Sequence, residues 1–309
     1  MQDRRRRRDK GESMETTRKI RSITTARPVI EGAGVHLRRA IGLGKPEEYD
    51  PFLLFDDFRS DDPADYRAGF PWHPHRGIET VTYVLKGTVA HGDSTGTRGE
   101  IGAGDVQWMT AGGGIYHQEM PRGDPNGSMH GFQLWVNLPA RDKMTEPRYR
   151  GVSSADIPAV RRGDGVEIKV IAGSCDGVSG PVADVVSRPI YLDVFVPAGK
   201  DFSLDTRVGD TCLVYAHEGA FLADAEEPLA ASGGSKAIVH NRDVALFGDG
   251  SSLRITAGEE GARFLLISGT PIGEPIAWRG PIVMNTQEEL RQAWADLEAG
   301  TFVRTASGK

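Results

Sequence analysis

The chain has 309 residues, 39% hydrophobic and 26% charged, which is typical of a globular protein and excludes a wholly disordered one. The length suggests about two domains of roughly 150 residues each. A formal net charge of -6 gives no electrostatic reason to bind nucleic acid directly. No apolar run is long enough to cross a membrane, and two cysteines do not make a disulfide framework. The basic start is not followed by an apolar stretch, so we expect a cytoplasmic protein without a signal peptide.

Residues 1–13 include an uninterrupted run from Arg4 to Arg8. Such a block of like charge cannot pack, so we predict a disordered basic tail. A solvated tail is the simpler interpretation, and a nuclear-entry or nucleic-acid arm is the alternative.

The first half after this tail is a series of short β-type runs separated by turns rich in glycine. Strands are predicted near residues 20–23, 35–41, 50–58, 80–85, 106–109 and 132–138. A spacing of about ten residues between such strands favours an all-β sandwich or barrel.

A polar stretch from residue 139 to 150 follows, and the β pattern then resumes near residues 166–171, 190–196, 211–216, 244–247, 253–257 and 264–267. We therefore predict an N-terminal barrel at 14–140, a linker at 141–150 and a C-terminal barrel at 151–275. The last segment, 276–309, is predicted to hold a helix and a tail. Two similar β-rich halves also suggest a duplication.

The predicted helix begins at Asn285 and Glu288, which are spaced as a capping box, and Gly300 is a suitable end. Its apolar positions, Leu290, Ala293, Trp294 and Leu297, form one stripe. We expect the helix to dock on a barrel; binding a partner is the alternative.

Two pairs of possible metal ligands lie in the first half, each with a spacing of i and i+2. The pairs are His73 with His75 and His117 with Glu119. Alternate side chains leave the same face of a strand, so both pairs could point into one hollow. Three imidazoles and a carboxylate suit iron, copper, nickel, manganese or zinc rather than calcium or magnesium. Four protein ligands leave a position open, as in a catalytic site.

The alternative is that these groups are structural. A carboxylate at position 119, inside a barrel expected to be lined by Tyr83, Leu85, Trp108 and Met109, is costly unless a cation meets it. A protonated histidine is the local substitute for a metal. The second half has no comparable pair, so we predict no metal site in the second barrel.

Other polar residues near these pairs receive supporting roles. By strand parity Glu79 shares a face with His75, and we expect it to orient a ligand histidine rather than bind the metal itself. The three glycines at 112–114 are predicted to form a turn between strands. His130 and Gln133 either reach the cavity or are satisfied structural groups.

Six motifs along the chain carry a family resemblance: Asp50-Pro-Phe-Leu-Leu-Phe-Asp56, His73-Pro-His-Arg-Gly77, Gly104-Asp-Val-Gln-Trp-Met-Thr-Ala-Gly112, His117-Gln-Glu-Met-Pro121, His130-Gly-Phe-Gln-Leu-Trp-Val-Asn137 and Gly280-Pro-Ile-Val-Met-Asn285. Together they resemble the motifs of the pirins, a two-barrel branch of the cupins. The resemblance runs from about residue 18 to 299. The basic tail is not part of the family pattern.

The resemblance implies two packed cupin (jelly-roll) barrels with a short C-terminal helix. It also implies one divalent metal in the first barrel, iron before zinc, manganese, nickel, copper or cobalt. The family's ligand pattern falls on His73, His75, His117 and Glu119, whereas the position of Glu79 is not a ligand.

Several family members resemble quercetinases, which open a flavonol ring with dioxygen and release carbon monoxide. On that reading Glu119 is both ligand and general base, the partners are a small aromatic substrate and dioxygen, and Trp72, Trp108 and Phe132 are candidate walls. A regulatory protein that uses iron to control binding of a protein partner is the alternative. A cupin acting on sugars or small acids would need basic residues facing the metal, and Arg76 alone offers little support.

Overall fold

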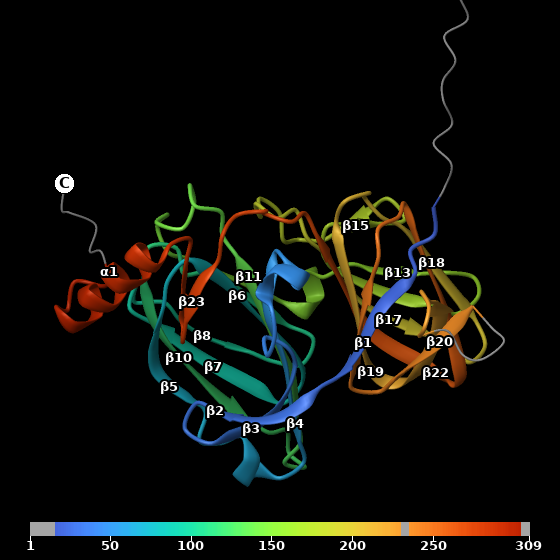
Figure 1. Ribbon diagram of the computed structural model, residues 1–309. Coiled ribbons are helices and arrows are strands. Elements are labelled where there is room, and N and C mark those ends of the chain that lie inside the picture. The colour runs from blue at the N-terminus through green and yellow to red at the C-terminus, as the bar shows by residue number, and fades with distance from the viewer. Residues whose placement is uncertain (1–15, 230–234, 304–309) are drawn as a thin grey trace, which may run out of the picture.

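The computed structural model describes residues 16–229 and 235–303, so the predicted basic tail lies outside the described residues. It consists of two β-barrels side by side with one α-helix, which confirms the all-β fold (Figure 1). In the described part of the chain, no helix has the length and apolar character needed to cross a membrane.

The N-terminal barrel is built from a seven-stranded and a four-stranded antiparallel sheet. The larger sheet has the order β12 (Arg148–Val152), β9 (Val106–Thr110), β6 (Ile78–Lys86), β11 (Met129–Asn137), β4 (Phe52–Ser60), β3 (Val35–Ile41) and β2 (Arg27–Glu31). The smaller sheet has the order β5 (Phe70–His75), β10 (Ile115–Arg122), β7 (Thr88–Asp93) and β8 (Arg98–Ile101).

The C-terminal barrel repeats this strand order in a single nine-stranded sheet. Its main path is β1 (Ile20–Thr25), β21 (Asp243–Phe247), β19 (Thr211–Asp224), β22 (Ser252–Gly269), β17 (Ile190–Val196), β14 (Glu167–Ala172) and β13 (Ala159–Arg161). Strand β18 (Asp201–Asp205) also pairs with β22, and β20 (Lys236–His240) pairs with β19. Short hairpins are made by β15 (Ser174–Cys175) with β16 (Val178–Ser179), and by β23 (Ala277–Arg279) with β24 (Ile282–Met284). The runs predicted near 253–257 and 264–267 are one continuous strand, β22.

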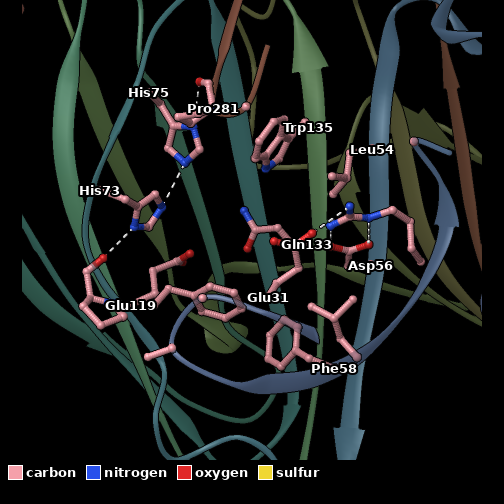
Figure 2. A pocket seen from close by; sticks show the side chains of 18 of the residues that line it. Glu31, Leu54, Asp56, Phe58, His73, His75, Glu119, Gln133, Trp135 and Pro281 are labelled. Atoms are coloured by element: carbon pink, nitrogen blue, oxygen red, sulfur yellow. Dashed lines mark hydrogen bonds and ion pairs between the residues drawn. The ribbon is translucent and has the colours of Figure 1, made fainter. Parts of the chain in front are cut away.

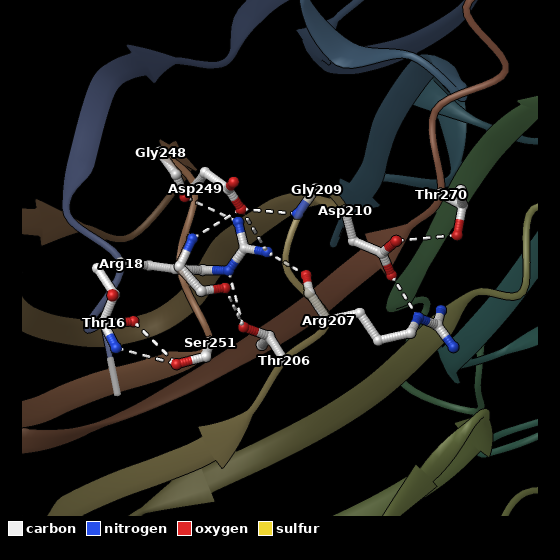
Figure 3. Close-up of polar contacts among 11 residues, drawn as sticks. Thr16, Arg18, Thr206, Arg207, Gly209, Asp210, Gly248, Asp249, Ser251 and Thr270 are labelled. Carbon is white, nitrogen blue, oxygen red and sulfur yellow. Dashed lines mark hydrogen bonds and ion pairs between the residues drawn. The ribbon is translucent and has the colours of Figure 1, made fainter. Parts of the chain in front are cut away.

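The two halves exchange edge strands. Strand β1, from the start of the chain, pairs with β21 of the C-terminal barrel, whereas β12, from the end of the predicted linker, pairs with β9 of the N-terminal barrel. The buried guanidinium of Arg18 anchors the N-terminal segment, donating to Thr206 Oγ1 at 2.8 Å and to the Gly248 carbonyl at 2.7 Å (Figure 3). The barrels predicted at 14–140 and 151–275 are therefore interleaved at their edges.

Facing sheets of the two barrels enclose a common apolar core with a reciprocal polar contact. Tyr83 of the first barrel donates to Asp193 of the second at 2.7 Å, and Tyr215 of the second donates to Asp57 of the first at 2.8 Å. Burial raises the pKa of both tyrosines well above its ordinary value. Each Asp also pairs with an arginine, so neither carboxylate depends on its tyrosine alone.

The terminal helix α1 spans Gln287–Glu298, and its cap differs by one residue from the prediction. Thr286 rather than Asn285 is the N-cap, and it forms the capping box with Glu289. The Asn285 amide instead donates to Glu274 at 3.0 Å, so its side chain is committed to the preceding loop. The helix packs on β23 and β24, at the N-terminal barrel (Figure 1), as the docking prediction required.

Candidate metal centre and its cavity

Three histidines converge on the inner face of the four-stranded sheet. His73 and His75 alternate along β5, His117 lies on β10, and His73 is the register partner of His117. Their possible ligand atoms all lie within 4.8 Å of one another. The i, i+2 spacing read from the sequence therefore places these side chains on one face, as predicted.

Tight turns fix the ends of these two strands. Gly77, just after His75, has a φ of +80°, and a Cβ there would lie 1.9 Å from the Val283 carbonyl oxygen. Gly112 has a φ of +49°, and its Cβ would lie 2.1 Å from the Thr145 carbonyl oxygen. The glycines at 112–114 form a turn between β9 and β10, as predicted. Only glycine fits at these two positions.

The donor set fits a transition metal because its cluster-facing nitrogens have no carboxylate or backbone partner among the described residues. The side chain of His117 is fully buried, and neither ring nitrogen has a hydrogen-bond partner among the described residues. Nε2 of His73 and Nε2 of His75 face each other at 3.1 Å. Burial lowers the pKa of His75 to about 3 and holds that of His117 well below its ordinary value. Neutral imidazoles with unshared lone pairs are what a metal ion requires.

The backbone orients two of these rings. Nδ1 of His73 lies 2.8 Å from the Pro71 carbonyl oxygen, and Nδ1 of His75 lies 3.2 Å from that of Pro281. Each contact leaves the Nε2 atom directed at the centre of the cluster. Pro281 comes from the C-terminal segment, so the docked end of the chain helps to form the site.

Glu119 shares the cavity but lies outside the three-histidine cluster. Its Oε1 accepts from Thr82 Oγ1 at 2.7 Å and from Gln107 Nε2 at 2.9 Å. Two donors on one oxygen fix the carboxylate and leave Oε2 for another partner. The fourth predicted ligand is therefore near the histidines and well oriented, and its binding to a metal stays a prediction.

A cavity of about 760 Å³ opens in front of this cluster. Its walls include His73, His75 and Glu119 on one side and Asp56 on the other (Figure 2). Arg39, which also lines the cavity, pairs with Asp56. Apolar walls come from Leu37, Leu54, Phe58, Phe70, Trp72, Trp135 and Trp278. The volume falls within the roughly 300–1,000 Å³ usual for small-molecule sites.

Of the three aromatic walls predicted, Trp72 alone lines the cavity. Trp108 and Phe132 belong to the core between the barrels, as does Tyr83, which was expected inside. Strand alternation gives the reason, because these residues lie on the opposite face from Gln107, Gln133 and Thr82, which surround the site. Trp135 is a wall that sequence reasoning missed, with its ring 5.0 Å from that of His75.

The role predicted for Glu79 is wrong. Its Oε1 accepts from Thr110 at 2.6 Å, and on β6 it shares a face with Val81 and Tyr83, which pack in the core between the barrels. Gly77 interrupts the strand between His75 and Glu79, so parity does not carry across the turn. Gln133 does line the cavity, whereas His130 lies 3.7 Å from Asp57 at the junction of the barrels.

His91 and Asp93 form a support behind the cluster that sequence reasoning also missed. Nε2 of His91 lies 3.0 Å from Asp93 Oδ2, and the His91 ring is 5.6 Å from that of His117. Burial would raise the pKa of Asp93, but hydrogen bonds from Thr95 and His91 lower it overall. The i, i+2 spacing of His91 and Asp93 on a strand was the available signal.

The fold and the site define a bicupin with a candidate metal centre in its first barrel. Comparisons with known proteins then specify the family. The Pirin family model matches residues 34–136, and the Pirin C-terminal cupin domain matches residues 191–303. The chain belongs to the pirin family.

Individual relatives agree along almost the whole chain. A pirin-like protein from Caulobacter vibrioides is 44% identical over 92% of this chain and 99% of its own length. A protein from Pseudomonas aeruginosa named "Putative quercetin 2,3-dioxygenase" is 43% identical over 94% and 99%. A crystal structure titled as quercetin 2,3-dioxygenase from Acinetobacter baumannii has a TM-score of 0.81 and 32% identity, covering 93% of this chain and 99% of that one.

Proposed function

We propose that the protein is a metal-dependent dioxygenase that opens the ring of a flavonol such as quercetin, acting in the cytoplasm. The proposal is carried by the aromatic-walled cavity that Glu119, His73 and His75 line, with His117 in the same histidine cluster and Glu119 Oε1 fixed while Oε2 is available. The names of the relatives from Pseudomonas aeruginosa and Acinetobacter baumannii support the same chemistry.

In this proposal His73, His75 and His117, with Glu119 as fourth ligand, hold one divalent metal, for which iron is our first choice. When bound, the metal supplies Lewis acidity and an open position that brings a flavonol and dioxygen together. The carboxylate of Glu119 takes the proton from the 3-hydroxyl of the flavonol, and Thr82 and Gln107 keep it aimed at that proton. Trp72 and Trp135 cover the aromatic rings and exclude water.

Residues lining the cavity disfavour a cupin that acts on small acids. Among the described residues that line it, Arg39 is the sole Lys or Arg, and Asp56 already occupies it. Arg76 points elsewhere, forming a 2.7 Å ion pair with Asp296 of the terminal helix. A carboxylate substrate would meet no free guanidinium here.

The test uses protein prepared without oxygen and loaded separately with iron, nickel, manganese, copper, cobalt or zinc. Quercetin and dioxygen are then added, and we expect the flavonol absorbance to fall as carbon monoxide is released. Glu119→Gln should retain metal and lose about 10²–10⁴-fold in turnover, the usual contribution of a placed base. Exposed Glu100→Gln on β8 is the matched control.

Absence of turnover with all of these metals would reject the dioxygenase and favour the regulatory alternative, in which the metal controls binding of a protein partner. Unchanged turnover in Glu119→Gln would remove Glu119 from the role of base.

A further inference from the structure

The cavity wall opposite the histidines carries a fixed ion-pair network. Arg39 donates from Nε and Nη2 to the two oxygens of Asp56, at 2.8 Å each. Nη1 of Arg39 also lies 2.9 Å from Glu31 Oε1. All three residues line the cavity, and Figure 2 shows Asp56 across from His73 and His75.

This wall is acidic overall. One guanidinium charge faces two carboxylates, which leaves a net charge of -1 when both are ionised. Asp56 is 4% exposed and lines the cavity, so a second donor to either of its oxygens, beyond Arg39, would come from a ligand there rather than from bulk water. Glu31, with 41% of its side chain exposed, lies at the mouth, and its Oε2 has no partner among the described residues.

Gln133, between this wall and Glu119, adds a further acceptor. The hydroxyl of Thr82 lies 2.7 Å from Glu119 Oε1 and 2.9 Å from Gln133 Oε1, yet it has one proton. If Thr82 donates to Glu119, a half-turn of the Gln133 amide lets Nε2 donate to Thr82 instead. The amide oxygen is then unpaired on a residue that lines the cavity.

The acceptor sites that the protein leaves open on Asp56, Glu31 and Gln133 call for a ligand that brings its own donors. Phenolic hydroxyl groups meet this need without adding charge, whereas a carboxylate would be repelled by Asp56 and Glu31. The apolar and aromatic walls between the two polar ends suit a flat ring system.

We propose that Asp56, Glu31 and Gln133 form a hydroxyl-recognition subsite that makes the cavity select neutral, polyhydroxylated aromatic ligands over aromatic ligands without distal hydroxyls. This inference rests on the proposed function, since it takes the end of the ligand nearest the histidines to be the reacting end. Asp56 and Glu31 are specificity-determining residues, and neither takes part in the proton transfer.

The test measures equilibrium binding without dioxygen, so that no turnover is needed. Metal-loaded protein is titrated with quercetin and with 3-hydroxyflavone, which keeps the 3-hydroxyl and lacks the other hydroxyl groups. We expect quercetin to bind at least about tenfold more tightly, the scale of a hydrogen bond to a charged acceptor.

Two variants test whether Asp56 and Glu31 cause the tighter binding of quercetin. Asp56→Asn and Glu31→Gln should each reduce the ratio of the two dissociation constants by about threefold or more, mainly by weakening quercetin. Binding of 3-hydroxyflavone should stay the same. Glu31→Gln is at the exposed mouth and should fold normally, whatever Asp56→Asn does to stability. Glu100→Gln, away from the cavity, should keep the full ratio.

Equal binding of both flavonols by the unmodified protein, or an unchanged ratio in both variants, would overturn the subsite. Failure of both flavonols to bind would overturn the subsite and the flavonol substrate together. A normal ratio with no turnover in dioxygen would leave the subsite standing and reject the dioxygenase alone.

Discussion

The two barrels share a strand order, yet one is hollow and polar where the other is filled. Across the sheet of the first barrel, the register aligns Gln107, Thr82, Gln133 and Asp56. The same path across the second barrel aligns Ala245, Val214, Leu266 and Leu192, all buried in its core. Each of these four polar positions thus has an apolar counterpart in the second barrel.

The ligand strands differ in the same way. In the first barrel His73 pairs with His117, whereas in the second barrel strands β18 and β22 pair Phe202 with Ile255. Both of these apolar residues lie in the second core. The same barrel fold therefore has either an apolar core or a polar cavity, depending on which residues occupy the inward-facing positions of its strands. Buried imidazoles without hydrogen-bond partners are unfavourable unless a cation binds them. The interior of the first barrel is therefore less stabilising by itself than the apolar core of the second barrel.

Removing a ligand should produce the largest difference between the barrels. His117→Ala is expected to lower metal affinity by more than the roughly 10–100-fold typical of an outer partner, so that metal no longer copurifies. His240→Ala, an exposed histidine of the second barrel, should keep about one metal per chain. Metal analysis of both proteins decides this, and stoichiometric metal in His117→Ala would refute the ligand assignment.

A large-to-small substitution in the core of the second barrel should reduce the stability of the protein and leave its metal content unchanged. Phe202 is fully buried, and Phe202→Ala is expected to lower the free energy of unfolding by about 3–5 kcal/mol. Phe195→Ala, at a 41% exposed position on the neighbouring strand, should cost much less. Denaturant titration measures both, and similar costs would contradict the description of a packed second core.

The polar row of the first barrel should give a pH dependence that its apolar counterpart lacks. Burial raises the pKa of Asp56 to about 6, despite the opposing effect of Arg39. Native protein then holds a proton that unfolded protein releases, so this group makes stability fall as pH rises from about 4 to 6, by about 3 kcal/mol in total.

Asp56→Asn should remove this component, so the difference in unfolding free energy between variant and parent changes across that window. Exposed Asp205→Asn serves as the control. Parallel stability curves for Asp56→Asn and the parent between pH 4 and 6 would show that Asp56 does not titrate there.

The smallest predicted effects on stability concern the two reciprocal tyrosine–aspartate hydrogen bonds, a feature that the barrels have in common. Tyr83→Phe and Tyr215→Phe each remove one hydrogen bond to a buried carboxylate and should cost about 1.5–3 kcal/mol apiece. Tyr116 lies on β10 and contacts Phe302, away from the junction of the barrels, so Tyr116→Phe should change the free energy of unfolding by no more than about 0.5 kcal/mol. Clearly unequal costs at Tyr83 and Tyr215 would show that the reciprocal contacts are not energetically equivalent.

The sequence alone determined the β class, most strand positions and the i, i+2 histidine pair that joins His117 in one cluster. These follow from a period of two within single strands, a local property that needs no knowledge of neighbours. It also placed a terminal amphipathic helix correctly to within one residue of its cap, because capping signals are local.

Only the tertiary structure decided which face of each strand lines the cavity and which face packs in the core between the barrels. Trp108 and Phe132 were assigned to the cavity but pack between the barrels, because each strand of the shared sheets has a core on both faces. Glu79 lies on the face of β6 that packs between the barrels rather than on the cavity face, because Gly77 breaks the parity between β5 and β6. The exchange of β1 and β12, and the support of His75 by Pro281, join residues far apart in sequence. Such long-range pairing is set by packing, which no local pattern records.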